Sequence, residues 1–466
     1  MTARPLYDMF FTCKDKTYWR PRMCILHQLL ESFKEDFAHS RKGHERSQWF
    51  IYTLLSVIIP FTSSKTSNLL RCLHTIFGLS HITKRRFYTF MASSKIPWQG
   101  LWKTVRKAVP APLTEGRLLV GLDDCINLKT GKKIFGCHRF FDHAAKQNQT
   151  SYPWAQNIVA AGLLAQIKGR WACLPLASRF YHPKKALEKQ DVRVGKEKVT
   201  FQTKLEQASE MLIELYHTYK APLLAVTDSW FGNNGLWAPM RKQLGSDFHL
   251  LSRLRSNNNL YDLPEPKGER KKPGRPRKYG AFAGKASELA SRFFDQAMSY
   301  NVHLYGRIRE VMAFDRVFML KTLKCPVRVV WVYNKTQWVA LFSTDLSLTV
   351  QQIIEYYGAR WKIESGFKEL KQNIGSSESQ CRKPHAVINH LNLCMMAISV
   401  TWIYAMQIEN TPKRRHAVKG RNHFAFSDVR RDITEVVLSD NFPSFCSSKG
   451  KSMINSIASS LLRMAA

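Results

Sequence analysis

The stretch from Tyr356 to Gly375 constrains this chain more than any other, because it predicts both a helix and the two faces of that helix. It contains no proline and ends at a glycine, the usual residue for closing a helix. At about 100° per residue, its large apolar side chains fall within an arc of roughly 60°. They are Tyr356, Ile363, Phe367, Leu370 and Ile374. The pattern predicts a helix that packs this stripe into the core of a globular protein.

A polar row borders the apolar stripe on the same predicted helix. It consists of Tyr357, Arg360, Glu364 and Lys371, which fall in a second arc of roughly 60°. Two interpretations are open. The row is either a solvated flank with an i,i+4 ion pair between Arg360 and Glu364, or the wall of a cleft that holds phosphates beside Glu364. Other carboxylates brought close to Glu364 by the fold would favour the cleft.

The net charge indicates the kind of partner. The 466 residues carry 71 Lys and Arg against 35 Asp and Glu, a formal charge of +36. Such an excess implies a polyanionic partner. Nucleic acid is favoured over a membrane, because the most apolar run, residues 49–61, is too short to cross a bilayer. The ten cysteines include no CxxC pair and the N-terminus lacks a secretory signal, so we expect reduced thiols in the cytoplasm and no zinc site.

Residues 1–110 are predicted to form a helical, basic DNA-binding domain. Apolar residues recur at helical spacing in 63–77, Gly78 makes a turn, and 81–91 can form a second helix. This layout suits a helix-turn-helix, and it also suits two packed helices with an exposed basic edge. Pro110 marks the end of the domain.

Carboxylates follow two predicted strands in the next region. The apolar run 118–122 leads into Asp123 and Asp124, and the run 223–226 leads through a threonine into Asp228. Further strands are predicted at 157–165, 170–176 and 248–251, and helices at 200–219 and 233–244. This order is that of an α/β fold, a ribonuclease-H-like mixed sheet flanked by helices, with its site at strand ends. We assign residues 111–256 and 338–406 to this catalytic domain.

Residues 257–337 are too many for a plain loop and are predicted as an insertion before the catalytic helix. They begin with a basic linker whose residues 274–277, Gly-Arg-Pro-Arg, resemble an AT-hook core that places Arg275 and Arg277 in a minor groove. A flexible linker that touches phosphates without specificity is the alternative. Strand-like runs follow and predict a β-rich insertion. Residues 407–466 are assigned to a C-terminal tail.

Asp123, Asp228 and Glu364 resemble the DDE triad of bacterial cut-and-paste transposases, in their order and in the elements that carry them. The resemblance implies that the three carboxylates are catalytic and hold two Mg²⁺ (or Mn²⁺) ions. The chemistry agrees, because hard cations prefer oxygen ligands and two of them can activate a nucleophile and stabilise the leaving oxygen of a phosphodiester. Asp124 competes for the first position, and Cys125 stands where the family has Thr or Ser. Asp123 is favoured because the family uses the first aspartate of this strand.

The polar row defined above is similar to the Y-R-E-K signature of the insertion-sequence transposases of family four. The resemblance implies that Tyr357, Arg360 and Lys371 bind DNA phosphates near the transposon end. In hairpin-forming relatives an insertion-domain tryptophan stacks on a flipped base, for which Trp331 and Trp338 are candidates here. Core packing is the alternative for either tryptophan.

The expected function is metal-dependent DNA cleavage and strand transfer at the terminal inverted repeats of an insertion sequence, which is cut-and-paste transposition. The expected partners are double-stranded DNA, as transposon ends and as target, and a second copy of the chain in a synaptic complex. No membrane partner is expected, and the expected place is the bacterial cytoplasm, on the nucleoid. Two alternatives stay open: an inactive DNA-binding relic of a transposase, and a structure-specific nuclease of the same fold.

Overall fold

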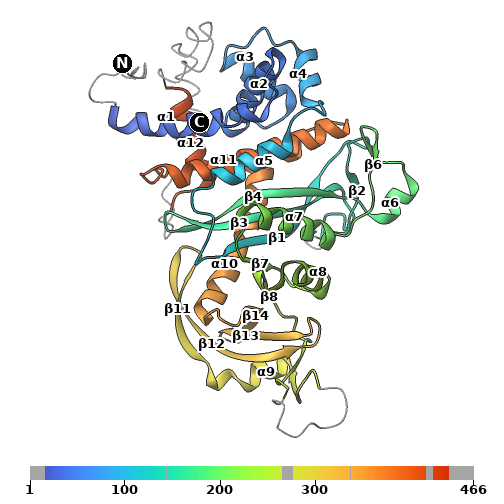
Figure 1. Ribbon diagram of the computed structural model, residues 1–466, viewed down its shortest axis with the longest axis vertical. Coiled ribbons are helices and arrows are strands. Elements are labelled where there is room, and N and C mark those ends of the chain that lie inside the picture. The colour runs from blue at the N-terminus through green and yellow to red at the C-terminus, as the bar shows by residue number, and fades with distance from the viewer. Residues whose placement is uncertain are drawn as a thin grey trace.

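The structure is a computed structural model that describes residues 16–142, 145, 147–264, 277–335, 337–415 and 423–439. Along its long axis the molecule has a helical layer, a central sheet with helices on its faces, and a β-rich region (Figure 1). The sheet continues from the centre into the β-rich region.

One 12-stranded sheet carries the fold, in the order β10-β9-β12-β13-β14-β8-β7-β1-β3-β2, with β4 paired to β3 and β11 to β12. Its strands before the insertion are β1 (Leu118–Leu128), β2 (Cys137–Arg139), β3 (Trp154–Ile167), β4 (Arg170–Tyr181), β7 (Leu223–Thr227) and β8 (Phe248–Arg253). β1, β7 and β8 are parallel, and β3 and β4 run antiparallel to their neighbours. This arrangement confirms the predicted ribonuclease-H-like fold class. β5 (Arg193–Val194) and β6 (Glu197–Lys198) form a separate hairpin.

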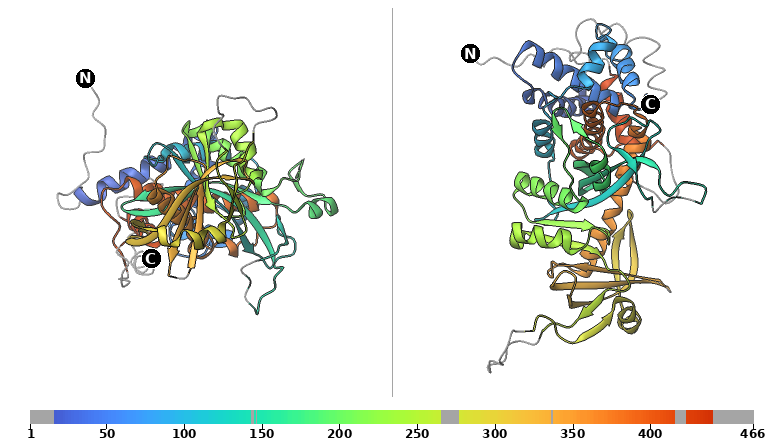
Figure 2. Two further views of the ribbon diagram at one scale, coloured as in Figure 1. Left: turned by 90° about the horizontal axis from the view of Figure 1, so that it is seen from below. Right: turned by 90° about the vertical axis from the view of Figure 1, so that its right-hand side faces the viewer.

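Helices cover the sheet on both faces. α7 (Lys204–Tyr219) and α8 (Asn234–Leu244) lie on one face, and α10 (Val350–Lys368) lies on the other (Figure 2). A strand buried on both faces needs apolar side chains at successive positions, and residues 158–165 of β3 and 223–226 of β7 are such continuous apolar runs. The short helix α6 (Lys184–Lys189) buries no residue, whereas α9 (Ala286–Arg292) buries Ala286, Leu289 and Ala290.

α10 confirms the predicted core-facing helix. All five side chains of the apolar stripe, from Tyr356 to Ile374, are buried. The helix continues into a π-helical segment, Glu369–Asn373, and the chain turns at Gly375, whose φ is +76°. Because a π segment adds a residue to the turn, Lys371 is displaced from the arc that an uninterrupted α-helix would give it.

The helical layer is built around α11 (Pro384–Gln407). Its N-terminal members are α1 (Lys16–Glu31), α2 (Arg41–Ile58), α3 (Thr66–Thr75), α4 (Lys84–Met91) and α5 (Trp98–Ala108). α12 (Phe426–Val437) packs against α1, α2 and α11. The Arg430 guanidinium of α12 is buried and donates to the carbonyl oxygens of Ile58 (2.6 Å) and Asn373 (2.6 Å). This segment is therefore part of the helical layer, which differs from the predicted tail.

α3 and α4 have the layout predicted for a helix-turn-helix, with Gly78 at a φ of +65° between them. α4 buries Phe87 and Phe90 and exposes Lys84 and Arg85. An exposed basic helix can contact DNA phosphates, and the same surface is left by two helices that only pack together. DNA binding by this domain stays a prediction.

The insertion is continuous with the catalytic sheet. Its strands are β9 (Asn259–Tyr261), β10 (Phe282–Lys285), β11 (Met298–Leu304), β12 (Arg307–Leu320), β13 (Cys325–Asn334) and β14 (Gln337–Ser343). β14 pairs antiparallel with β8, so the predicted boundary at residue 338 falls inside a strand of the common sheet. Arg275 lies outside the described residues, and Arg277 is exposed.

α11 is, in the described part of the chain, the one helix long and apolar enough to cross a membrane by length and composition. It has 24 residues, and 89% of its most apolar window is buried inside the protein. Its side chains meet the N-terminal helices on one side and β4 on the other. Its composition is therefore explained by its place between the helical layer and the sheet.

The contact between α11 and the N-terminal helices predicts that acid weakens the fold. His390 on α11 is buried with its Nε2 2.6 Å from the Ser64 carbonyl oxygen. Burial lowers the pKa of His390 from 6.5 to about 4. Between these two pH values the unfolded chain binds more protons than the folded chain, so stability is retained above pH 6.5 and lost as the pH falls toward 4. The expected slope from this group is about 1.4 kcal/mol per pH unit.

Urea unfolding followed by circular dichroism at several pH values between 7.5 and 4.5 measures this slope. His390→Gln should flatten it, because glutamine does not titrate. His182, whose pKa burial also lowers to about 4, keeps part of the slope in that variant. An unchanged slope in His390→Gln would show that His390 is not the group responsible.

Candidate active site

Asp123 and Asp228 stand side by side at one edge of the sheet. β1 and β7 are parallel neighbours whose last registered pair is Leu122 opposite Thr227, and Asp123 and Asp228 are the next residues along the chain. Asp228 directly follows β7 as predicted, whereas Asp123 lies inside β1, which continues to Leu128. Neighbouring strands lie about 4.8 Å apart, and residues at the same level point to the same face. The structure therefore brings the first two predicted acids together.

The loop after β7 is held by Asp228 itself. Its Oδ1 accepts hydrogen bonds from the backbone N–H groups of Trp230 (3.0 Å) and Phe231 (2.9 Å), which is the pattern of an Asx turn. Ser252 Oγ donates to the Asp228 carbonyl oxygen at 2.7 Å. Gly232 is required here, because a Cβ atom would lie 2.1 Å from that hydroxyl. With Oδ1 used in the turn, Oδ2 is the Asp228 oxygen that can serve a ligand.

α10 brings Glu364 to the same edge through Arg360. Arg360 donates from Nη1 to Asp123 Oδ2 (3.3 Å) and from Nη2 to Glu364 Oε1 (2.9 Å). The i,i+4 ion pair of the first interpretation is therefore present. However, the Arg360 side chain is only 7% exposed and faces the acids, so at this residue the polar row is not a solvated flank, whereas the Glu364 side chain is 39% exposed.

Asp124 points to the opposite face of β1, as the alternation of a strand requires. Its Oδ2 accepts from Lys204 Nζ on α7 (2.8 Å) and from Asn157 Nδ2 on β3 (2.7 Å). Of the two candidate aspartates, Asp123 is the one that shares a face with Arg360.

Asp123 lies where a carboxylate is difficult to ionise. Burial raises the pKa of Asp123 to about 7; Arg360 opposes this shift, and the negative charge of Asp228 adds to it. A cation close to such a carboxyl group strongly stabilises its ionised form. Cys125 is buried, and burial raises the pKa of its thiol, so it stays neutral and adds no further anion.

Within the described ranges, no three His, Cys, Asp or Glu side chains are grouped closely enough to hold a metal ion as they stand. Between Asp123 and Glu364 lies the Arg360 guanidinium, which is itself a cation. The donor set fits a hard divalent ion, because three carboxylates supply oxygen ligands and a positive charge already lies between two of them.

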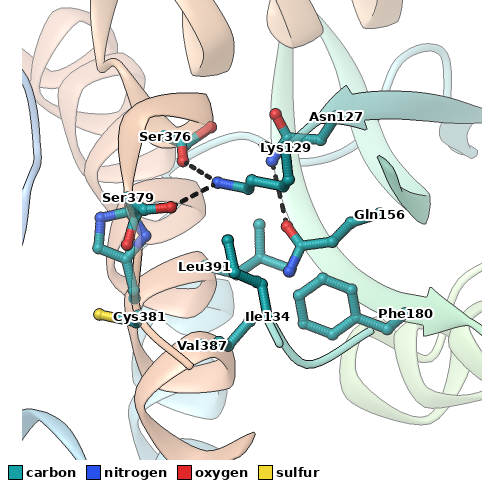
Figure 3. A pocket seen from close by; sticks show the side chains of 11 residues that line it. Asn127, Lys129, Ile134, Gln156, Phe180, Ser376, Ser379, Cys381, Val387 and Leu391 are labelled. Atoms are coloured by element: carbon teal, nitrogen blue, oxygen red, sulfur yellow. Dashed lines mark hydrogen bonds between the residues drawn. The ribbon is translucent and has the colours of Figure 1, made fainter. Parts of the chain in front are cut away.

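Two lysines tie the end of β1 to the chain that follows α10. Lys371 Nζ donates to the Ile126 carbonyl oxygen at 3.1 Å, so this predicted phosphate ligand is engaged with the backbone. Lys129 is buried and donates to three carbonyl oxygens of the turn 376–379, at 2.8 to 3.1 Å. Figure 3 shows the bonds to Ser376 and Ser379. The pocket beside Lys129 has about 10 Å³, room for about one water molecule. Sequence analysis missed this anchor, because nothing in the sequence distinguishes a buried lysine from an exposed one.

The Arg360 guanidinium lies between two aromatic rings of α10. Its central carbon is 5.7 Å from the centre of the Tyr357 ring and 5.3 Å from that of Trp361. Tyr357 is half-buried, whereas Trp361 is 46% exposed. Arg360 Nε is buried and finds no acceptor among the described residues. The guanidinium thus donates to two carboxylates and leaves its Nε donor unused.

Trp331 is not available to DNA, which corrects the prediction made for it. The side chain is fully buried and packs against Phe293, Phe314 and Phe318. Its Nε1 donates to the Ala286 carbonyl oxygen at 3.0 Å. Trp331 is a core residue of the β-rich region, because α9 and its flanking turn cover the face of β13 that carries it.

Two exposed tryptophans beside the acids were missed by sequence analysis. Trp230 is 44% exposed, lies two residues after Asp228, and has Lys204 Nζ 5.5 Å from its ring centre. Trp361 directly follows Arg360. Large exposed aromatic rings commonly mark contact surfaces. The available signal was the position of Trp230 in a polar turn next to a predicted acid.

A groove of about 980 Å³ lies elsewhere, between α5, β4, α7 and the β5–β6 hairpin. Its cations include Lys103, Lys107 and Lys198. None of the three acids lines this groove, so cavity size does not identify the acidic site. The acidic site is identified by its chemistry alone.

Comparison with known proteins agrees with that chemistry. A family model described as DDE superfamily endonuclease matches residues 72–305, just over half of the 466 residues. Asp123 and Asp228 lie inside the matched residues and Glu364 lies outside them. No curated protein matches the chain. The extent of the family match shows that the chain belongs to the DDE superfamily endonucleases.

Proposed function

We propose that this protein is a transposase that cleaves and joins DNA at the terminal inverted repeats of an insertion sequence. The observation that carries the proposal is that Asp123 and Asp228 lie on neighbouring parallel segments of a ribonuclease-H-like sheet and that Arg360 links Asp123 to Glu364. Membership of the DDE superfamily endonucleases supports DNA cleavage. The Y-R-E-K spacing on α10 supports the finer assignment to the family-four type.

The three carboxylates would hold two Mg²⁺ or Mn²⁺ ions. When bound, such ions activate a water or a 3′-hydroxyl and stabilise the leaving oxygen of the phosphodiester. The Asx turn keeps Asp228 Oδ2 available, and the Lys371 contact with β1 keeps α10 in register with Asp123. Arg360 is the residue best placed to take a phosphate, because a guanidinium forms paired hydrogen bonds to phosphate oxygens.

Double-stranded DNA is the proposed partner, as transposon ends and as target. The formal charge of +36 and the exposed Lys84 and Arg85 of α4 support backbone contacts over a long duplex. The exposed ring of Trp361, directly after Arg360, offers aromatic surface near the acids. The exposed ring of Trp230 lies against Lys204, which holds Asp124 on the other face of β1. The family resemblance supports a homodimer that synapses two ends, acting on the nucleoid in the bacterial cytoplasm.

An inactive DNA-binding relic is the second candidate. It is favoured by the absence, within the described residues, of a ready metal site, and by Cys125 at a position where the family has a hydroxyl. A structure-specific nuclease would share the three acids and differ only in the DNA that it selects.

Incubation with a labelled duplex that carries the element's terminal repeat tests the proposal. We expect strand cleavage in Mg²⁺ or Mn²⁺ and none in EDTA, with DNA binding retained in both, because the carboxylates need cations for chemistry and the basic surface does not. A duplex with a scrambled repeat is the control. Binding without cleavage in either metal would establish the relic. Equal cleavage of the repeat and of unrelated branched DNA would favour the structure-specific nuclease.

A further inference from the structure

Arg360 lies where an ion shared by Asp123 and Glu364 would have to bind. Its two terminal nitrogens are 3.3 Å from Asp123 Oδ2 and 2.9 Å from Glu364 Oε1. We propose that Arg360 is a latch: without DNA it keeps these two carboxylates from sharing a metal ion, and a DNA phosphate releases it. This inference rests on the proposed function and adds a regulation of the same site.

The position of Arg360 between Asp123 and Glu364, which we call the closed position, is stable for electrostatic reasons. Asp123 has Asp228 beside it and Glu364 across the Arg360 guanidinium, and without a cation these carboxylates would repel one another. Arg360 supplies a permanent positive charge from a side chain that is only 7% exposed. The rings of Tyr357 and Trp361 flank the guanidinium and keep it in place. In DNA-free protein the Arg360 guanidinium therefore supplies the positive charge between Asp123 and Glu364, and no metal ion is needed there.

The closed position is also easy to leave. The bond to Asp123 is 3.3 Å long, longer than the roughly 2.7–2.9 Å of a strong charge-assisted hydrogen bond. Arg360 Nε is buried without an acceptor among the described residues, a cost that a phosphate could remove. A phosphate matches the planar fork of the guanidinium better than two separate carboxylates do. Trp361, which is 46% exposed, offers a surface along which the side chain can reach solvent.

The consequence is that DNA and metal bind cooperatively. A phosphate that draws Arg360 away leaves Asp123 and Glu364 without a cation, and a divalent ion then gains the most by binding there. By linkage, a metal ion that displaces Arg360 must raise the affinity for duplex DNA by the same factor. The site between Asp123 and Glu364 would therefore bind a divalent ion tightly only in protein that already has DNA bound.

The first test measures Mn²⁺ binding to DNA-free protein, by the electron paramagnetic resonance signal of free Mn²⁺. We expect Arg360→Ala to bind Mn²⁺ about 10-fold or more tightly than wild type, within the usual range for such couplings. Arg360→Lys, which keeps the charge and loses the fork, should fall between them. Arg328→Ala is the matched control, because Arg328 pairs with Asp315 and the Leu348 carbonyl oxygen, away from the acids. Its Mn²⁺ affinity should equal that of wild type.

A second substitution assigns the Mn²⁺ to the site. The tighter Mn²⁺ binding expected for Arg360→Ala should be lost in the double variant Arg360→Ala, Asp123→Asn. If Arg360→Ala binds no tighter than wild type while Asp123→Asn weakens both, the latch is overturned and the metal site of the proposed function stands. If neither protein binds Mn²⁺ through Asp123, the latch is overturned and the metal site of the proposed function fails with it. Circular dichroism of each variant confirms that it is folded.

The reciprocal test follows a labelled duplex of unrelated sequence by fluorescence anisotropy, with and without Mn²⁺. Wild type should gain affinity for the duplex in Mn²⁺ relative to Arg360→Ala, because only wild type has a latch for the metal to displace. If Mn²⁺ changed the duplex affinity of the two proteins equally, DNA binding would not be coupled to the release of Arg360. That result would overturn the proposal.

Discussion

Replacing Asp123 by asparagine is expected to reduce DNA cleavage by about 10³-fold or more, a loss of roughly 4 kcal/mol of transition-state stabilisation. The substitution removes a negative charge from the face of β1 that meets Arg360 and Glu364, and it barely changes the shape of the side chain. Glu364→Gln should have an effect of the same order. Single-turnover cleavage of a labelled repeat in saturating Mg²⁺ gives the rate, and gel shift shows that binding is retained.

Asp124→Asn is the matched control on the neighbouring residue. Asp124 lies on the other face of the strand, held by Lys204 and Asn157, so its loss should change cleavage by less than about 10-fold. The reverse outcome, with Asp124→Asn inactive and Asp123→Asn active, would make Asp124 the first acid. Loss of activity in both variants would indicate that catalysis depends on both aspartates of β1, and that the charge of Asp123 alone does not explain it.

Trp331→Ala is expected to destabilise the fold by about 3–5 kcal/mol, the usual cost of truncating a buried tryptophan. The ring is fully buried among three phenylalanines, and its Nε1 hydrogen bond to Ala286 holds α9 on the sheet. Urea unfolding followed by far-ultraviolet circular dichroism measures the loss. The folded fraction should still cleave DNA at the wild-type rate per molecule, because the side chain does not face the acids.

Trp338→Ala serves as the comparison, since Trp338 is half-buried on the neighbouring strand β14. Its loss should cost about 1 kcal/mol, the centre of the range for point substitutions. If Trp331→Ala left stability unchanged and abolished end processing, the base-stacking role would return and the packing described for β13 would be wrong.

The sequence by itself determined the local elements and which side of α10 is buried. Helical periodicity in the stretch from Tyr356 to Gly375 depends only on neighbours within two turns, so it can be read without knowing the fold. The same holds for the end of β7 before Asp228, because an apolar run followed by a carboxylate is a local pattern. The predicted strand end at Asp123 is wrong, because β1 continues to Leu128 through its pairing with β3. The order of these elements was enough to predict a ribonuclease-H-like sheet.

The boundaries of the larger parts depended on contacts that the sequence does not display. α12 belongs to the helical layer because Arg430 reaches carbonyl oxygens of two distant segments. The insertion is part of the main sheet because β14 pairs with β8. Both facts concern residues far apart in the chain, where periodicity carries no information.

Only the tertiary structure decided how the polar groups meet. The alternation of side chains along a strand predicts that Asp123 and Asp124 point to opposite faces of β1. The packing of α10 against one of these faces determines that Asp123 is the residue that contacts Arg360. The burial of Trp331 likewise follows from what covers β13. A side chain's type is local, whereas its neighbours, its exposure and its charge environment are set by segments that come together only when the chain folds.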